Sequence, residues 1–328
     1  MTANRAPRMA VVGVGHFGRH HARVLSELDQ VRLEAVVDVD GDRAAAVAAE
    51  FGTTAFDSIE ALEGQVDAVT LAVPTKAHSV VAVPLLARGV SVLVEKPIAR
   101  SLKEADAMLT AAAESGAILA VGHTERFNPA VAAALPLVRS PRFIEVHRIG
   151  AFPSRSLDID VVFDLMIHDL DIIATAVDSP LDSVEAVGVP VLSDRVDIAN
   201  ARLCFETGCI ANLTASRISR DRVRKLRFFQ QDAYISIDCA EQQVEGWRVR
   251  RGGDEGPAIE GGRLEIAAGE PLVLELTDFV AAVRAGTPSL VDGRAGRRAL
   301  ELAQRVAEAM AAERARTELG ASDEDGHE

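Results

Sequence analysis

The sequence predicts an α/β domain with a parallel sheet, followed by an α+β domain with an open, mainly antiparallel sheet. In the first third of the chain, short apolar runs alternate with helical patterns, which is the rhythm of parallel strands joined by crossover helices. In the second part, strand-like segments follow one another directly. The length of 328 residues suits about two domains.

The first domain is expected to cover residues 1–125. Strands are predicted at 9–14, 33–37, 68–73, 91–94 and 118–121, with helices at 17–28, 43–51, 76–87 and 102–115 between them. Runs such as VTLAV and SVLV are apolar on both faces, which is typical of strands that helices cover on both sides. The rhythm ends near residues 121–128, where we place the boundary.

The second domain is expected over residues 126–314. Strands are predicted at 142–149, 184–192, 198–205, 209–217, 225–230 and 234–238, and helices at 160–177, 272–284 and 294–314. The segment FETGC predicts a hairpin in which Gly208 supplies the positive φ of the turn. The acidic end of the chain, residues 315–328, is predicted to be a disordered tail.

Composition and charge exclude several classes of function. The net charge of −14 repels nucleic acid and anionic membrane surfaces. No apolar run approaches the ~20 residues of a membrane helix, and the polar start MTANRAPR lacks a signal-peptide core. Cys204, Cys209 and Cys239 are too few and too irregularly spaced for a metal knuckle or a disulfide framework. We therefore expect a soluble, cytoplasmic protein without a bound metal.

The segment Gly13-Val14-Gly15-His16-Phe17-Gly18 follows the first strand and opens the first helix. Its first glycine permits a tight turn, its second lets the backbone approach a pyrophosphate, and its third permits close helix–strand packing. The helix N-terminus offers free N–H groups to the phosphates. In this context the motif predicts a Rossmann dinucleotide-binding domain, against the alternative of a glycine-rich turn without a ligand.

An acidic residue ends the second predicted strand. Asp38 stands twenty residues beyond Gly18, where its carboxylate can bind both ribose hydroxyls of NAD and would repel the 2′-phosphate of NADP. Arg43 keeps NADP open as an alternative. The sequence therefore favours NAD as the cofactor.

The triplet Glu95-Lys96-Pro97 ends the strand SVLV, at the sheet edge where ligands bind in doubly wound folds. The chain contains only four lysines, and arginine takes every other basic position. An amine, unlike a guanidinium, can exchange its proton with a substrate oxygen. Lys96 is therefore a candidate catalytic residue, with a surface lysine at a strand end as the alternative.

Other residues are expected near the same edge. Pro74, Thr75 and His78 follow the 68–73 strand and can line a cofactor cleft, although a helix-start turn explains them equally well. Arg126 lies at the domain boundary, where Asn128 before Pro129 also fits a helix N-cap.

An apolar helical pattern, DVVFDLMIHDLDIIATAV, carries charged residues on one stripe. Asp164, His168 and Asp171 stand at i, i+4 and i+7. Burying charged groups is costly unless they are paired, so the stripe predicts either a hydrogen-bonded buried network or a catalytic group facing a cleft. His168 has an ordinary pKa suited to proton transfer near neutrality. A metal site is disfavoured because a third and a fourth ligand are not evident.

A basic run interrupts the acidic chain at Arg217, Arg220, Arg222, Arg224, Lys225 and Arg227. It can face an anionic substrate or an oligomer interface, and a solvated strand face is the favoured interpretation.

Taken together, Gly13-x-Gly15-x-x-Gly18, Glu95-Lys96-Pro97 and Asp164-x-x-x-His168 resemble the Gfo/Idh/MocA family of NAD(P)-dependent sugar and polyol oxidoreductases. The resemblance implies that Lys96, Asp164 and His168 form the catalytic trio, that a cis peptide precedes Pro97, and that the second domain's sheet serves substrate binding and assembly into a homodimer or homotetramer. The resulting set of expected cofactor-binding residues is Gly13, Gly15, His16, Phe17, Gly18, Asp38, Pro74, Thr75, His78, Glu95, Lys96, Pro97 and Arg126.

Longer segments, among them VGHTERFNPA and RKLRFFQQDAYISID, resemble a bacterial subgroup that oxidises C3 of UDP-N-acetylglucosamine for lipid A biosynthesis. The resemblance implies a nucleotide-sugar substrate, a PLP-dependent aminotransferase that acts next, and local arginines such as Arg126, Arg148, Arg155 or Arg217. Open alternatives are a dehydrogenase of an inositol, a free sugar or another nucleotide sugar, and a non-catalytic NAD-binding sensor. Whether Lys96 or His168 is the base also stays open.

Overall fold

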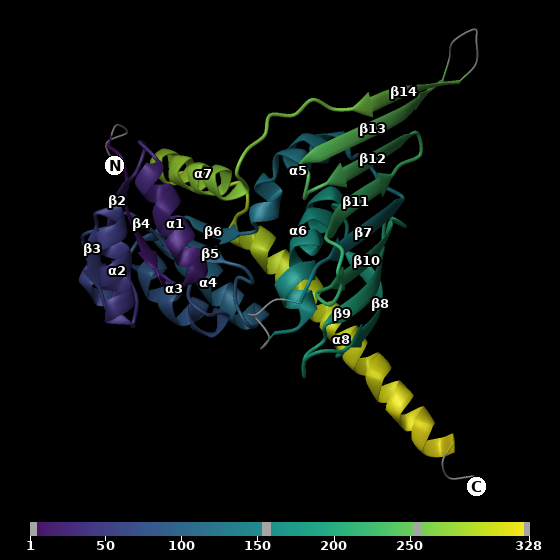
Figure 1. Ribbon diagram of the computed structural model, residues 1–328, viewed down its shortest axis with the longest axis horizontal. Coiled ribbons are helices and arrows are strands. Elements are labelled where there is room, and N and C mark those ends of the chain that lie inside the picture. Colours follow the sequence, from purple (N-terminus) through teal and green to yellow (C-terminus); the bar gives the residue numbers. More distant parts are fainter. Residues whose placement is uncertain (1–4, 153–158, 252–256, 325–328) are drawn as a thin grey trace. The chain divides into compact units, whose positions relative to one another are not determined.

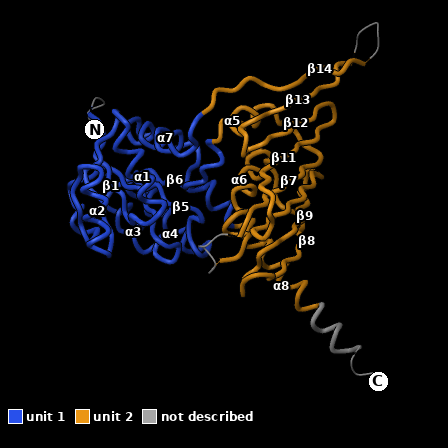
Figure 2. Tube along the Cα trace, viewed as in Figure 1, with its two compact units in different colours: residues 1–127, 269–300 blue, residues 128–268, 301–328 orange. Residues whose placement is uncertain are grey.

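The computed structural model describes residues 5–152, 159–251 and 257–324, which form two compact units (Figure 2). The first unit contains residues 1–127 and 269–300, and the second contains residues 128–268 and 301–328. The sequence analysis ended the first domain at residue 125 and kept 269–300 in the second domain. The structure corrects that assignment, because residues 269–300 contribute apolar side chains to the core of the first unit.

A six-stranded parallel sheet forms the centre of the first unit (Figure 1). The strand order is β3-β2-β1-β4-β5-β6. Strands β2 and β3 are therefore added on one side of β1, and strands β4 to β6 on its other side, so the order of addition reverses beside β1. In this arrangement ligands bind beyond the carboxyl ends of the strands at the reversal. The strands are β1 (Arg8–Val12), β2 (Arg32–Val37), β3 (Thr54–Phe56), β4 (Ala68–Leu71), β5 (Ser91–Glu95) and β6 (Leu119–Gly122).

Helices connect these strands, and two of them begin with a side-chain cap. Asp40 caps α2 by accepting the Arg43 N–H, and Ser101 caps α4 by accepting the Glu104 N–H. The helical segments of this part are α1 (His16–Glu27), α2 (Gly41–Phe51), η1 (Ile59–Leu62), η2 (Thr75–Ala77), α3 (His78–Ala87), α4 (Leu102–Ser115) and η3 (Thr124–Phe127). The predicted alternation is thus confirmed, and the additions are the three-residue β3 and the short segments η1 and η3.

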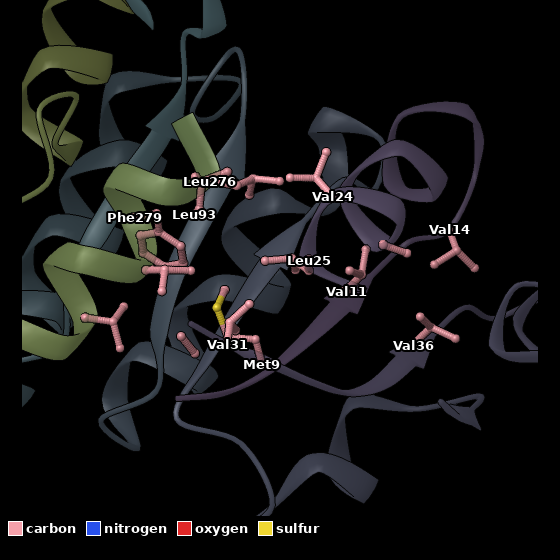
Figure 3. Packing of buried hydrophobic residues seen from close by; sticks show 14 of the residues in the cluster. Met9, Val11, Val14, Val24, Leu25, Val31, Val36, Leu93, Leu276 and Phe279 are labelled. Atoms are coloured by element: carbon pink, nitrogen blue, oxygen red, sulfur yellow. The ribbon is translucent and has the colours of Figure 1, made fainter. Parts of the chain in front are cut away.

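Helix α7 (Pro271–Ala285) completes the core of the first unit from a distant part of the sequence (Figure 3). Its Leu276 and Phe279 are fully buried and belong to the same cluster as Met9 and Val11 of β1 and Leu25 of α1. Burying an aliphatic or aromatic side chain contributes about 1.5–3 kcal/mol to folding. The N-terminal unit therefore depends on a C-terminal helix for part of its stability.

The second unit contains an eight-stranded sheet in the order β14-β13-β12-β11-β7-β10-β9-β8. β7 and β10 are parallel, and the other neighbouring pairs are antiparallel, which confirms the predicted mainly antiparallel sheet. Gly208 has φ +78° in the predicted hairpin. The strands are β7 (Phe143–Ile149), β8 (Leu181–Val189), β9 (Ile198–Phe205), β10 (Ile210–Ser216), β11 (Val223–Phe229), β12 (Ala233–Asp238), β13 (Gln243–Arg250) and β14 (Ala258–Arg263).

The helices of the second unit differ from the prediction at η5, at the end of α8 and in two short additional segments. The predicted helix 160–177 begins as a π-helix, η5 (Val162–Met166), and continues as α6 (Ile167–Ala176). Helix α8 (Gly293–Glu324), which crosses the division at residue 300, extends ten residues into the predicted disordered tail because Ala, Glu and Arg are strong helix formers. Residues 325–328 of that tail lie outside the described residues. The short segments α5 (Pro129–Ala134) and η4 (Leu135–Leu137) complete the unit.

Within the described ranges, every helix is either too short or too polar to cross a bilayer.

Candidate active site

The glycine-rich turn after β1 has the geometry that a dinucleotide requires. Gly13 has φ +84°, and a Cβ there would lie 2.7 Å from Val73 Cγ1. A Cβ on Gly18 would lie 1.8 Å from the Gly13 carbonyl oxygen, so only glycine lets α1 start this close to the strand. Gly15 is different, because a Cβ there would meet nothing within 4 Å. The space in front of Gly15 is open to a pyrophosphate.

The start of α1 adds to this fit. Gly15 is the N-cap residue and has no side chain to satisfy the first N–H groups of the helix. His16 and Phe17 follow at the exposed start, and their rings contact each other edge to face. Free N–H groups at a helix N-terminus bind phosphate oxygens. The turn therefore fits the pyrophosphate of NAD.

A side chain at Gly15 should impair cofactor binding but not folding, because a Cβ there meets no protein atom within 4 Å. Replacing Gly15 by Val is expected to weaken NAD binding by at least about tenfold, because its side chain enters the space of the pyrophosphate. Calorimetric titration with NAD measures this change. The Tm without NAD should stay within about 4 °C of the wild type, a shift that corresponds to about 1 kcal/mol. Unchanged NAD affinity in the variant would contradict the placement of the pyrophosphate.

Asp38 lies directly beyond β2 and beside the same turn. Its Oδ2 accepts the Val14 N–H at 2.9 Å, and its Oδ1 accepts the Asp40 N–H at 3.0 Å. A carboxylate at this position can accept hydrogen bonds from the hydroxyls of a ribose. Arg43 donates to both oxygens of Asp38 at 3.3 Å and to Asp40 at 2.8 Å. With its arginine engaged by two acids, this corner suits the ribose hydroxyls of NAD rather than the 2′-phosphate of NADP.

The turn after β5 carries Lys96, which is half-buried. The Lys96–Pro97 peptide is cis, as the family resemblance implied. His78 fixes this turn to the end of β4, because its Nδ1 lies 3.0 Å from the Pro97 carbonyl oxygen and its Nε2 lies 2.9 Å from that of Val73. Burial lowers the pKa of His78. Both ring nitrogens thus face backbone carbonyl oxygens. His78 therefore positions the backbone of this edge and has no ring nitrogen left for the cofactor.

Glu95, the residue before Lys96, is hydrogen-bonded to helix α1. Its Oε1 accepts a hydrogen bond from His21 Nε2 of α1 at 3.0 Å. Burial opposes ionisation of this carboxyl, but the hydrogen bond and the charges of His21 and Lys96 outweigh burial and lower its pKa. Glu95 is therefore an anion on the inner side of the turn.

The other residues expected at this edge lie in the segments that follow β4 and β6. Pro74 is the N-cap residue of η2, and Thr75 is its first residue, which supports the helix-start interpretation. Arg126 is buried in η3. The predicted N-cap at Asn128 is confirmed, because its Oδ1 accepts the Ala130 N–H at 3.0 Å.

Asp164 and His168 lie at the junction of η5 and α6 in the second unit, and both are half-buried. Asp171 is fully buried, so the predicted stripe does not have one common environment. The extra residue in the π-turn changes which residues share a face, and π-bulges are frequent at functional sites. Asp164 and His168 thus differ from Asp171 in their exposure to solvent.

Arg148 and Asp169 form a buried ion pair beside His168. Arg148 of β7 donates from Nε and Nη2 to the two Asp169 oxygens at 2.7 and 2.8 Å. Both side chains are at most 4% exposed. This pair joins α6 to the sheet and leaves Arg148 unavailable to a substrate, which corrects its expected role as a phosphate-binding arginine.

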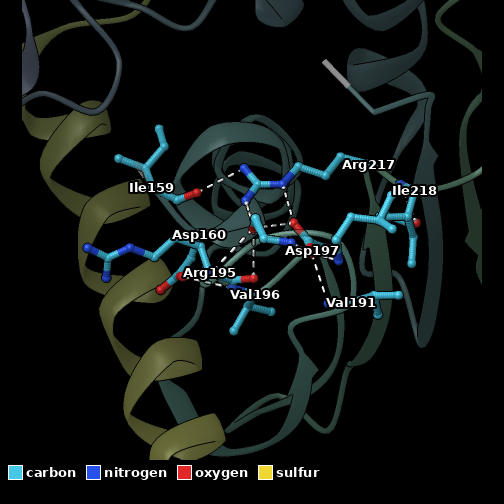
Figure 4. Close-up of polar contacts among 11 residues, drawn as sticks. Ile159, Asp160, Val191, Arg195, Val196, Asp197, Arg217 and Ile218 are labelled. Atoms are coloured by element: carbon cyan, nitrogen blue, oxygen red, sulfur yellow. Dashed lines mark hydrogen bonds and ion pairs between the residues drawn. The ribbon is translucent and has the colours of Figure 1, made fainter. Parts of the chain in front are cut away.

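A second buried pair, Arg217 with Asp197, fixes the chain just before η5 (Figure 4). Arg217 Nε donates to Asp197 Oδ1 at 2.8 Å, and Arg217 Nη1 donates to the Ile159 carbonyl oxygen at 2.9 Å. Both side chains are at most 1% exposed. Arg217 is therefore a structural residue and not the substrate-binding arginine that the sequence suggested.

Asp197 also organises the loop after β8. Its Oδ2 accepts the N–H groups of Val191, Leu192 and Ser193 at 2.7–2.9 Å. Burial opposes its ionisation, but these donors, the Ser193 hydroxyl and Arg217 together hold the pKa of Asp197 far below its ordinary range. The same loop binds the segment before η5, since the Val161 N–H donates to the Val196 carbonyl oxygen at 3.0 Å.

Two more basic residues of the run lie on β11 and are paired with acids on neighbouring strands. Arg227 donates to Glu145 at 2.8 Å, and Lys225 lies 3.5 Å from Asp238. The Arg227 and Lys225 side chains are 38% and 43% exposed, as expected of a solvated strand face. Arg155 lies outside the described residues.

Sequence reasoning missed Glu275 and Asp197. Glu275 is 1% exposed within α7, where a charged residue interrupts the apolar run PLVLEL. That interruption was the available signal, because a buried charged residue requires a specific partner. Asp197 gave no signal, since its donors come from a loop of irregular sequence.

Known proteins resemble this chain over most of its length. UDP-N-acetylglucosamine 3-dehydrogenase of Acidithiobacillus ferrooxidans is 40% identical over 303 residues, which cover 91% of this chain and 96% of that protein. Its solved structure superposes with a TM-score of 0.87 over 93% of this chain and 98% of that chain, at 38% identity. The scyllo-inositol 2-dehydrogenase (NAD(+)) of Bacillus subtilis is 30% identical over 65% of this chain and 68% of that protein.

More distant structures share the fold. A levoglucosan dehydrogenase in complex with NADH and levoglucosan superposes with a TM-score of 0.84 over 94% of this chain and 98% of that chain, at 16% identity. Residues 7–123 match the family described as oxidoreductase family, NAD-binding Rossmann fold. With this match, the near full-length relative and an NAD-compatible glycine turn, the chain belongs to the Gfo/Idh/MocA family of NAD-dependent oxidoreductases.

Proposed function

We propose that this protein oxidises the C3 hydroxyl of UDP-N-acetylglucosamine to the 3-keto sugar, with NAD as the hydride acceptor. The observation that carries the proposal is the 40% identity, over almost the full length of both chains, to the A. ferrooxidans enzyme of that name. The glycine turn with Asp38, the Glu95-Lys96-Pro97 turn and the Asp164–His168 segment are all present in this chain. A non-catalytic NAD sensor would not need Lys96, Asp164 and His168 together.

NAD, when bound on the first unit, supplies the nicotinamide ring that takes up the hydride. The residues of the chain would hold it: the Gly13–Gly18 turn its pyrophosphate, and Asp38 its ribose. His16, Phe17, Pro74, Thr75, Glu95, Pro97 and Arg126 complete the proposed cofactor region, with His78 acting through the backbone that it fixes.

Lys96, Asp164 and His168 are the proposed catalytic residues. Lys96 or His168 removes the proton of the C3 hydroxyl, and Lys96 also donates to the oxygen as negative charge develops there. Asp164 either orients Lys96 and His168 or balances their charge. Arg148 and Asp169 hold α6 against the sheet, which keeps His168 at a fixed position.

The chemistry of the product places the reaction before an amino transfer. A 3-keto sugar is the substrate that a PLP-dependent aminotransferase converts to the 3-amino sugar, and lipid A biosynthesis is the proposed setting. We also propose a cytoplasmic homodimer or homotetramer. The second sheet supports this proposal, since it carries a group of half-buried aromatic side chains, Phe143, Phe229 and Tyr234, with ring centroids 5.0–5.5 Å apart.

The test is NADH formation from NAD and UDP-N-acetylglucosamine, with and without a PLP-dependent aminotransferase and glutamate. The aminotransferase removes the ketone, so NADH is expected to accumulate several-fold further in the coupled arm even where the equilibrium is unfavourable. Free N-acetylglucosamine and an inositol serve as control substrates. NADH formation with inositol alone would favour a polyol dehydrogenase, and silence in both arms despite NAD binding would remove the nucleotide-sugar assignment.

A further inference from the structure

Two buried carboxyl groups lie behind the Lys96 turn, and the proposed mechanism uses neither. Glu275 of α7 is 1% exposed. Its Oε2 accepts a hydrogen bond from Thr124 Oγ1 at 3.2 Å. No polar atom of the described residues lies within hydrogen-bond distance of its Oε1. A buried carboxylate with one unsatisfied oxygen is costly, whereas a protonated carboxyl is much less so.

Glu95 provides the second carboxyl group, and it approaches the same short segment. A Cβ on Gly122 would lie 3.0 Å from Glu95 Oε1, and Thr124, the partner of Glu275, follows two residues later. The Glu95 side chain is 14% exposed and is bound to His21. The two acids therefore flank residues 122–124 from β5 and α7, and the charge of one acts on the other.

The surroundings of the two acids differ in charge. Burial, and then the negative charges of Glu95 and Asp278, raise the pKa of Glu275 well above its ordinary value. Glu95 instead faces His21, Lys96 and His78, which lower its pKa in spite of burial. The segment that passes between the acids adds His123, Glu125 and Arg126. Neighbouring like charges do not both ionise readily, so we expect one proton to stay on the pair, and Glu275, whose Oε1 has no hydrogen-bond partner among the described residues, is the acid that keeps it.

We propose that Glu275 is a positioning residue of the dehydrogenase site, held as a neutral acid so that Glu95 is the single negative charge behind Lys96. This inference rests on the proposed role of Lys96 at the substrate oxygen. That oxygen becomes negative in the transition state, and a second carboxylate charge behind Lys96 would oppose it. Loss of the Glu275 proton at alkaline pH is therefore expected to lower kcat.

The first test measures the proton without any substrate. Glu275→Gln replaces the neutral acid by a neutral group of the same shape. An acid with a raised folded-state pKa destabilises the fold increasingly as pH rises above its unfolded value, because the folded state retains a proton that the unfolded state releases. The Tm of the wild type should therefore fall relative to Glu275→Gln as the pH rises above about 4, the ordinary pKa of a glutamate in the unfolded chain.

Two further variants control this experiment. The exposed Glu114 offers a matched change, and Glu114→Gln should show a Tm difference that does not vary with pH. Glu95→Gln removes the neighbouring charge, so the pH dependence caused by Glu275 should become smaller in that background. A pH-independent difference between Glu275→Gln and the wild type would overturn the proposal.

The second test measures the effect on catalysis. Glu275→Gln should keep kcat within about twofold at neutral pH, leave KM for the nucleotide sugar unchanged, and retain activity further into the alkaline range than the wild type. An alkaline limb identical to that of the wild type would overturn the positioning role. A wild-type protein that oxidises no nucleotide sugar would refute the proposed function instead, while the Tm profile would still decide where the proton lies.

Discussion

Replacing Lys96 by Met is expected to lower kcat for NAD-dependent oxidation of the nucleotide sugar by about 10²–10⁴-fold, the usual contribution of a positioned acid–base group. Met has nearly the length of Lys but neither donates nor accepts a proton. Because Lys96 follows β5 and lies beyond the core, the fold should persist. Steady-state kinetics with NADH absorbance measures the loss.

His168→Asn is the companion variant, since it keeps a polar side chain of moderate size on α6 but removes the titratable ring. Lys103→Met is the matched control, because Lys103 is exposed on α4 and should leave kcat unchanged. The pH profiles of the two active-site variants show which residue supplies the base. If both retain turnover within about tenfold of the wild type, the catalytic assignment is wrong.

Replacing Asp197 by Ala is expected to reduce the free energy of unfolding by about 3–5 kcal/mol, because Arg217 would remain buried without its counter-charge. The loop 191–193 would lose its common acceptor as well. Since the pKa of Asp197 lies far below its ordinary range, its contribution holds across neutral pH and fades as the pH falls below about 4. Denaturant unfolding at several pH values measures both effects.

The exposed neighbour Asp194 provides the control, and Asp194→Ala should change stability by less than about 0.5 kcal/mol. In a double variant, Asp197→Leu with Arg217→Leu, the total loss should be smaller than the sum of the single losses, because no unpaired charge remains. Additive losses would mean that the two side chains stabilise the unit independently.

Local signals explain why much of the first unit could be predicted. The Gly13–Gly18 turn is recognisable because each glycine meets a steric requirement, and the structure confirms two of them with virtual Cβ contacts below 3 Å. Lys96 could be singled out because lysine is rare in this chain and because Lys96 itself follows a buried strand. Such signals depend on the backbone nearby and so appear in the local sequence.

Non-local contacts explain what could not be predicted. No local feature of the residues around α7 indicates that this helix packs on strands from the start of the chain. Residues 269–300 were therefore assigned to the second domain, and that assignment was wrong. Arg148 and Arg217 look like free cations in the sequence, and only their pairing with Asp169 and Asp197 makes them structural. The exposed strands β13 and β14 escaped prediction because their burial pattern shows no regular apolar alternation.

The division of the first unit between two distant segments has a consequence for synthesis. When the ribosome has made β1 through η3, the hydrophobic cluster still lacks Leu276 and Phe279. Those side chains arrive only after the whole second sheet has been translated. The nascent N-terminal part thus keeps an uncovered apolar surface while the sheet that follows it is made, and the nucleotide-binding half of the protein is completed only after that sheet, although its sequence comes first.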